Sequence, residues 1–132
     1  MDDIAPVQSL LPPNFLGWFS NRGWSPHAHQ IEMLKAAQDG ADALLIAPTG
    51  GGKTLSGFLP SLIDLSERPR EGLHTLYISP LKALAVDIQR NLESPVAELR
   101  LPIRTETRTG DTSAAKRQRQ RSKPPQILMT TP

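Results

Sequence analysis

The chain has 132 residues, a hydrophobic content of 38% and a net charge of +2, which suit one globular domain and exclude a disordered chain. It has no cysteine, which excludes a disulfide framework and thiolate metal sites. Prolines interrupt the apolar stretches of the N-terminal segment, so we expect neither a secretory signal nor a membrane span there. A cytoplasmic location is the expectation that fits these features.

A basic segment lies within this nearly neutral chain. Residues 104–123 hold seven Lys or Arg against two acidic residues, a local charge of +5, and the rest of the chain sums to −3. Such a run is commonly a solvated face, and contact with a polyanion is the other interpretation. The sequence leaves both interpretations open.

Two short helices are expected first along the chain. Residues 15–19 favour a helix that ends near Gly23. Ser25 and Pro26 offer an N-cap and a first-turn proline to a second helix, which Gly40 would close.

A glycine-rich loop at residues 47–54 follows the second helix. The apolar run at 43–47 is typical of a buried strand, and residues 54–67 place apolar side chains at helical spacing. Successive glycines let backbone N–H groups converge on an anion, and the helix behind them adds the positive end of its dipole. The order of strand, loop and helix predicts a phosphate-binding P-loop, with Ala47 in place of the glycine of the strict pattern.

This loop predicts ATP and Mg²⁺ as cofactors. Lys53 would reach the β- and γ-phosphates and the Thr54 hydroxyl would hold the Mg²⁺, so both are predicted catalytic residues. The nucleotide-binding residues predicted in the loop are Thr49, Gly50, Gly51, Gly52, Lys53 and Thr54.

Strand and helix signals alternate along the rest of the chain. Strands are predicted at residues 75–78, 103–107 and 126–130, helices at 54–67 and 82–92, and a basic helix after a turn at 110–112. Pro60 is expected to kink or open one helix, and Pro95 to break the next. The alternation predicts an α/β fold with a parallel sheet flanked by helices. A strand so near the last residue suggests a domain that is cut short.

No predicted strand ends in a carboxylate. A P-loop hydrolase needs an acidic residue near its Mg²⁺, and the predicted strands run instead into Pro48, Ser79 and Thr131. Asp64 and Asp87 lie on predicted helices as surface charges. We therefore expect these residues to bind a nucleoside triphosphate without hydrolysing it.

Several stretches together resemble superfamily 2 DExH-box helicases of the large-helicase-related (Lhr-like) branch, with ligase-associated bacterial DNA-repair helicases as the nearest fit. The stretches are residues 11–24, 47–54, 79–85, 109–112 and 130–132. The resemblance implies a RecA-like, truncated first helicase domain at residues 24–132 behind a lead segment at 1–23. The Asp-Glu-x-His box and a second RecA-like domain would lie beyond Pro132, so this piece alone would not translocate.

The resemblance also implies roles for residues outside the P-loop. Gln30 would read the adenine, because an amide both donates and accepts. Trp18, Phe19 and Trp24 would lie near the base or pack in the core. The residues that would grip a nucleic-acid backbone are Pro80, Lys82, Gly110, Thr112 and Thr130.

The function implied is the ATP-binding and nucleic-acid-binding part of an ATP-dependent DNA helicase in DNA repair. Its partners would be single-stranded or tailed DNA and a repair ligase or nuclease, with RNA left open. A non-catalytic short form that binds ATP or nucleic acid is the alternative. A small-molecule kinase would explain none of the motifs after residue 79.

Overall fold

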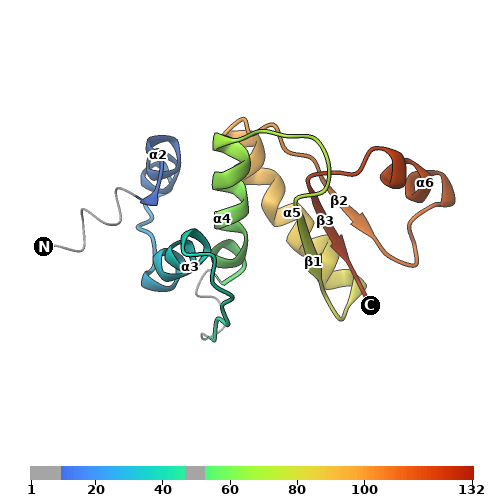
Figure 1. Cartoon of the computed structure of the whole chain (residues 1–132), viewed down its shortest axis with the longest axis horizontal. Coiled ribbons are helices and arrows are strands. Elements are labelled where there is room, and N and C mark those ends of the chain that lie inside the picture. The colour runs from blue at the N-terminus through green and yellow to red at the C-terminus, as the bar shows by residue number, and fades with distance from the viewer. Residues whose placement is uncertain (1–9, 47–52) are drawn as a thin grey trace, which may run out of the picture. The chain divides into compact units, whose positions relative to one another are not determined.

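The structure is a computed structural model that describes residues 10–46 and 53–132. The chain divides into two compact units, residues 1–64 and 65–132, each of which is described by itself (Figure 1). The first unit is helical in its described part, and the second carries a parallel sheet.

Helix α2 (Pro13–Asn21) opens the described part of the first unit. Its first residue is a proline, whose missing N–H would have no partner in a first turn anyway. Phe15, Trp18 and Phe19 are buried along one stripe at helical spacing. The chain leaves the helix at Gly23, whose φ of +70° favours glycine, so the predicted helix and its end are confirmed.

Helix α3 (Ala28–Gln38) begins later than the predicted cap at Ser25 and Pro26. Its N-cap is His27, whose backbone N–H donates to Gln30 Oε1 at 2.8 Å. Gln30 is the third residue of the helix, and its side chain accepts from the His27 N–H, which has no backbone acceptor within the helix. The predicted end is confirmed, because Gly40 has φ +70° and its N–H donates to the Ala37 carbonyl at 3.1 Å.

The strand predicted at residues 43–47 is wrong for its described part. Residues 43–46 lie in no helix or strand, and Leu44 and Ile46 are each 85% exposed. An apolar run becomes a strand only when a neighbouring strand takes up its N–H and C=O groups, and no described strand pairs with this segment. Ala47 lies outside the described residues.

Two helices run through internal prolines without a break. Helix α4 (Lys53–Glu67) crosses the boundary between the units and is continuous at Pro60, so of the kink or opening predicted there the opening is absent, and the kink stays a prediction. Helix α5 (Lys82–Glu98) contains Pro95, and the predicted break is also wrong. In α5 the buried stripe of Ala85, Ile88 and Leu92 extends to Pro95 itself. Burial of this face outweighs the one hydrogen bond that the proline removes.

The second unit contains three parallel strands in the order β1-β3-β2, which confirms the predicted α/β fold (Figure 1). They are β1 (Thr75–Ile78), β2 (Thr105–Arg108) and β3 (Ile127–Thr130). The bounds of β1 and β3 lie within one residue of the predicted bounds, and β2 starts two residues later than expected. Ile127 and Met129 of the central strand are fully buried.

The two faces of the sheet differ in cover. Gln89 of α5 donates to the Thr105 hydroxyl at 3.4 Å, which places α5 over the face that Thr105 shares with Ile127. On the opposite face, Leu76 and Ile78 of β1 are more than half exposed. The sheet is therefore covered unevenly within the described residues.

Side chains at both ends of the strands fix their register. At the amino ends, the buried Gln126 accepts from Arg104 N at 2.7 Å and donates to the Arg70 carbonyl at 3.1 Å. At the carboxyl ends, Thr130 Oγ1 donates to the Arg108 carbonyl at 2.6 Å. Register matters because a slip of one residue would turn every side chain to the other face.

The basic helix α6 (Ala114–Ser122) is attached to β2 through Glu106. Its N-cap is Ser113, whose Oγ accepts from Lys116 N at 3.2 Å. Arg119 Nη1 donates to Glu106 Oε2 at 3.1 Å, and Gln120 Nε2 donates to Glu106 Oε1 at 3.0 Å. Arg119, one of the cations of the basic run, is thus engaged with Glu106 and is neither part of a solvated face nor free for a polyanion.

These contacts govern the acidity of Glu106, whose side chain is 13% exposed. Burial pushes its pKa upward, but the hydrogen bonds from Arg119 and Gln120 and the positive charges of Arg119 and Lys116 outweigh burial. The pKa is therefore lowered below the ordinary value of 4.5. A carboxyl group with a lowered folded-state pKa stabilises the fold above the unfolded-state pKa, and this contribution is lost as the pH falls through the folded-state pKa.

The Glu106→Gln variant should therefore be less stable at neutral pH by about 1 kcal/mol, because Arg119 loses a charged acceptor. The deficit should shrink as the pH falls below 4.5 and the carboxyl of the parent is protonated. Urea unfolding at a series of pH values measures both effects. The control is Glu71→Gln at an exposed position. A deficit that stays constant into acid would contradict this account.

Candidate nucleotide and nucleic-acid sites

The start of α4 carries the described part of the predicted phosphate site. Lys53, half-buried, is its first residue, and the exposed Thr54 follows. The N–H groups of a first helical turn have no partner within the helix, so this end favours an anion. Thr49, Gly50, Gly51 and Gly52 lie outside the described residues, and their predicted part in the site stays a prediction.

A side-chain contact joins this end of α4 to the start of α3. His29 Nδ1 lies 2.6 Å from the hydroxyl of Ser56, a residue with no exposed surface. Gln30, the predicted adenine-reading residue, is next to His29 and is 2% exposed. The first turn of α3 thus lies against the first turn of α4, beside Lys53. Ser56 was missed at the sequence level, because no pattern links a serine to a histidine so far along the chain.

The aromatic residues predicted near the base divide into two kinds. Trp18 and Phe19 belong to the buried stripe of α2, where their rings meet edge to face at 5.4 Å. Trp24 is 49% exposed, and its ring meets that of Trp18 at 5.7 Å. The Arg22 guanidinium lies over both indoles, 4.6 Å from Trp18 and 5.2 Å from Trp24. Core packing therefore accounts for Trp18 and Phe19.

In the second unit, the predicted strand-contacting residues follow three strand ends that lie in one row. Thr130 is in register with Ile78 on one side and with Arg108 on the other. The Ser79 N–H extends the row by donating to the Thr130 carbonyl at 2.8 Å. Because parallel strands share their direction, the loops at 79–82, 109–112 and 130–132 leave the same edge of the sheet. The structure therefore brings together Pro80, Lys82, Gly110, Thr112 and Thr130.

Lys82 and Gly110 face one another across this edge. Lys82 Nζ lies 3.4 Å from Asp111 Oδ1, and both side chains are largely exposed. A Cβ on Gly110 would stand 3.6 Å from Lys82 Nζ, an ordinary contact distance. A groove of about 620 Å³ lies here, lined among others by Lys82, Asp111, Thr112 and Lys116. Lysines and carboxylates both line it, so it is not uniformly basic.

The two threonine hydroxyls at this edge are used differently. Thr112 Oγ1 accepts from Thr109 N at 2.9 Å, and no described residue accepts its hydroxyl hydrogen. Thr130 Oγ1 donates to the Arg108 carbonyl at 2.6 Å, so its hydroxyl hydrogen is used in a bond between β3 and β2. Thr112 is therefore the better placed of the two to donate to a phosphate oxygen.

The described residues hold neither a cluster of metal ligands nor a membrane-spanning helix. No group of three His, Cys, Asp or Glu side chains within residues 10–46 and 53–132 lies close enough to hold a metal ion. None of the helices in this part of the chain combines the length and apolar character that crossing a membrane requires.

Comparison with known proteins identifies the family. Residues 27–132 match the family model of the DEAD/DEAH box helicases. The chain belongs to the DEAD/DEAH box helicase family. It is 42% identical over 128 residues to the Lhr helicase/probable uracil glycosylase of Mycolicibacterium smegmatis, and 45% identical over 141 residues to the ATP-dependent helicase Lhr-Core protein 2 of Thermococcus barophilus. These alignments cover 87% and 96% of this chain but only 8% and 16% of the relatives.

Solved helicase structures share the fold. The structure of Mycobacterium smegmatis helicase Lhr bound to ssDNA and AMP-PNP matches with a TM-score of 0.86 and 35% identity over 96% of this chain and 17% of that one. The DUF1998 helicase MrfA bound to DNA and AMPPNP matches with a TM-score of 0.82 and 31% identity, over 92% and 17%. The predicted helicase family, its Lhr-like branch and the RecA-like fold are confirmed. The nearer likeness to ligase-associated helicases stays a prediction.

Gln30 offers a test of how the nucleotide end is built. The Gln30→Ala variant loses the acceptor for His27 N–H, and we expect it to be about 1 kcal/mol less stable. Gln30→Met keeps the buried volume but has no acceptor oxygen, so it should lose about as much as Gln30→Ala if the cap decides the effect. Urea unfolding measures both variants. Unfolding of Gln30→Ala at the urea concentration of the parent would mean that this cap does not hold α3.

Proposed function

We propose that this chain is the ATP-binding and nucleic-acid-binding part of an ATP-dependent DNA helicase or translocase that acts in DNA repair in the cytoplasm. The observation that carries the proposal is the convergence of three loops from separate strands at one sheet edge, in a chain of the helicase family. Relatives named ATP-dependent helicases, and related structures bound to DNA, support it.

In this proposal the nucleotide binds at the start of α4. Lys53 pairs with the β- and γ-phosphates, and Thr49 with Gly50, Gly51 and Gly52 supplies backbone N–H groups. Gln30 reads the adenine. The His29–Ser56 contact supports this assignment, because it holds the Gln30 end of α3 beside the phosphate end of α4.

Mg²⁺ fits this arrangement through a single protein ligand. The exposed Thr54 in the first turn of α4 offers its hydroxyl, and the described residues provide no cluster of acidic or histidine ligands. Mg²⁺ commonly keeps several waters and binds substrate phosphates with few protein groups. When bound, it would neutralise charge on the β- and γ-phosphates.

In the same proposal, the nucleic-acid strand lies along the carboxyl edge of the sheet. Lys82 stands at the start of α5, where its charge and the helix dipole both attract phosphate. Gly110 and Thr112 donate from the turn, while Pro80 and Thr130 complete the surface. These groups address phosphates and not bases, so we expect binding without sequence preference.

The alternative function is a non-catalytic module that binds ATP or nucleic acid. It is favoured by the residues that follow the described strands, which are Ser79, Thr109 and Thr131 and include no carboxylate at a strand end. An ATPase measurement separates the alternatives, since only a helicase motor couples turnover to single-stranded DNA. We propose a repair ligase or nuclease as a partner only for the helicase function, and not for the non-catalytic module.

Lys53 tests the nucleotide site. In the full-length protein, Lys53→Ala should lower ATP turnover by about 100-fold or more, because the positive charge that stabilises the transferred phosphoryl group is lost. Binding of single-stranded DNA should stay near the parental level. The matched control is Lys35→Ala, which removes an exposed lysine of α3 that we assign to neither site. Near-parental ATPase in Lys53→Ala would remove this assignment.

Gly110 tests the strand site independently of stability. The Gly110→Ala variant should unfold within about 0.5 kcal/mol of the parent, since its added methyl group meets only the flexible Lys82 side chain. That methyl group would stand between the turn and Lys82 and keep a phosphate away. We expect an affinity for labelled oligo-dT about 5-fold lower, as measured by fluorescence anisotropy. Unchanged affinity would place the strand elsewhere.

A further inference from the structure

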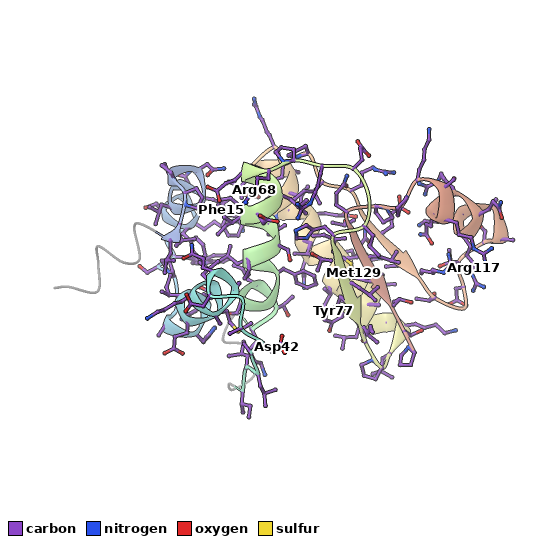
Figure 2. The ribbon with its side chains drawn as sticks, viewed as in Figure 1. Phe15, Asp42, Arg68, Tyr77, Arg117 and Met129 are labelled. Carbon is purple, nitrogen blue, oxygen red and sulfur yellow. The ribbon has the colours of Figure 1, made fainter. Side chains whose placement is uncertain are left out.

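Arg117 lies in the basic run but does not behave as a surface cation. Its Nη2 donates to the Thr109 carbonyl at 2.7 Å, and its Nε has almost no contact with solvent (Figure 2 labels Arg117). No described residue accepts from that Nε. The guanidinium is therefore turned into the junction between α6 and the end of β2.

A second arginine returns the contact. Arg108, the last residue of β2, donates from Nη1 to the Arg117 carbonyl at 3.2 Å. The Arg117 N–H donates to the Ser113 carbonyl at 3.0 Å, within the first turn of α6. The strand end and the helix are thus joined in both directions by arginine–carbonyl bonds, which are stronger than bonds between neutral groups.

Thr109, the acceptor for Arg117, organises the turn that follows β2. Its carbonyl also accepts from Thr112 N at 3.1 Å, and its N–H donates to Thr112 Oγ1 at 2.9 Å. Its hydroxyl accepts from Asp111 N at 3.2 Å. Three donors of the turn have no acceptor among the described residues: the Gly110 N–H and the hydroxyl hydrogens of Thr109 and Thr112. Thr109 is buried, so the Gly110 N–H and the Thr112 hydroxyl are the two that remain for a ligand.

We propose that Arg117 is a positioning residue for binding of the nucleic-acid backbone. It holds the Thr109 carbonyl, and through it the turn at 109–112, so that the Gly110 and Thr112 donors face the phosphate path beside Lys82. Arg117 acts through the turn and makes no phosphate contact of its own. This inference rests on the proposed function, because it deepens the account of the same strand site.

The geometry also distinguishes this role from ordinary charge attraction. An arginine that binds phosphate directly presents its fork of donors to solvent, whereas the Arg117 Nε is enclosed and its Nη2 is committed to a backbone carbonyl. Arg119 is the internal comparison. It lies on the same helix with the same charge, but its side chain pairs with Glu106 and makes no hydrogen bond to a described residue of the turn.

The test uses the full-length protein and fluorescence anisotropy with labelled oligo-dT at several salt concentrations. The variants are Arg117→Ala and the matched control Arg119→Ala, which removes an equal charge. We expect Arg117→Ala to weaken binding about 5- to 10-fold, and Arg119→Ala less than about 2-fold. The slope of log Kd against log salt should be equal in the two variants.

Two results would overturn the inference. Equal affinities in the two variants would mean that only charge matters. A slope smaller by about 0.7 in Arg117→Ala than in Arg119→Ala would mean that Arg117 itself neutralises one phosphate of the single strand. If the parent protein fails to bind oligo-dT, the proposed function is overturned together with this inference. The two results above concern the variants of a parent that binds, so they overturn the inference alone.

A further variant covers the case in which Arg117→Ala does not fold. Arg117→Gln is neutral but keeps an N–H that reaches toward the Thr109 carbonyl. The comparison is the double variant Arg119→Ala with Thr112→Val, which loses the same charge and also the Thr112 hydroxyl of the turn. If Arg117 acts through the Thr109 carbonyl, Arg117→Gln should bind oligo-dT more tightly than this double variant. Its slope of log Kd against log salt should equal that of Arg119→Ala. A slope lower than that of Arg119→Ala would again indicate a direct phosphate contact and overturn the proposal.

Discussion

The register of three parallel strands is the constraint on which the candidate strand site depends. Ile78, Thr130 and Arg108 form one row, so the segments behind them leave the sheet side by side although they lie far apart in the sequence. The register is held from both ends, by Gln126 at the amino side and by the Thr130 hydroxyl at the carboxyl side. A sheet that slipped by one residue would turn the Ile127 and Met129 side chains out of the core, so the site and the core are specified by the same pairing.

The basic run shows why a count of charges does not locate a binding surface. Arg119 is committed to Glu106, while Arg108 and Arg117 bind backbone carbonyls around the end of β2. These cations join α6 to the sheet. The points of contact that we propose for a polyanion are donors that the fold leaves unused at the carboxyl ends of the strands, most of which carry no charge.

Local patterns predicted the regular elements well and the contacts between them poorly. The periodicities of β1 and β3, the glycine at the end of α3 and the basic helix were predicted because each depends on neighbours in the sequence. The apolar run at 43–46 failed as a strand because strand formation depends on a partner. Pro95 failed as a helix breaker because burial of its face decided the outcome. Lys53 and Lys82 could be nominated from motifs, but the His29–Ser56 and Arg117–Thr109 contacts join residues whose proximity only the fold creates.

The uneven cover of the sheet has a consequence for handling the protein. Leu76 and Ile78 lie more than half exposed on β1, a strand with a neighbour on one side only among the described strands. An open strand edge beside an apolar face is a surface on which copies of a chain associate. Concentrated solutions of these 132 residues should therefore self-associate through this edge, which a net charge of only +2 does little to oppose.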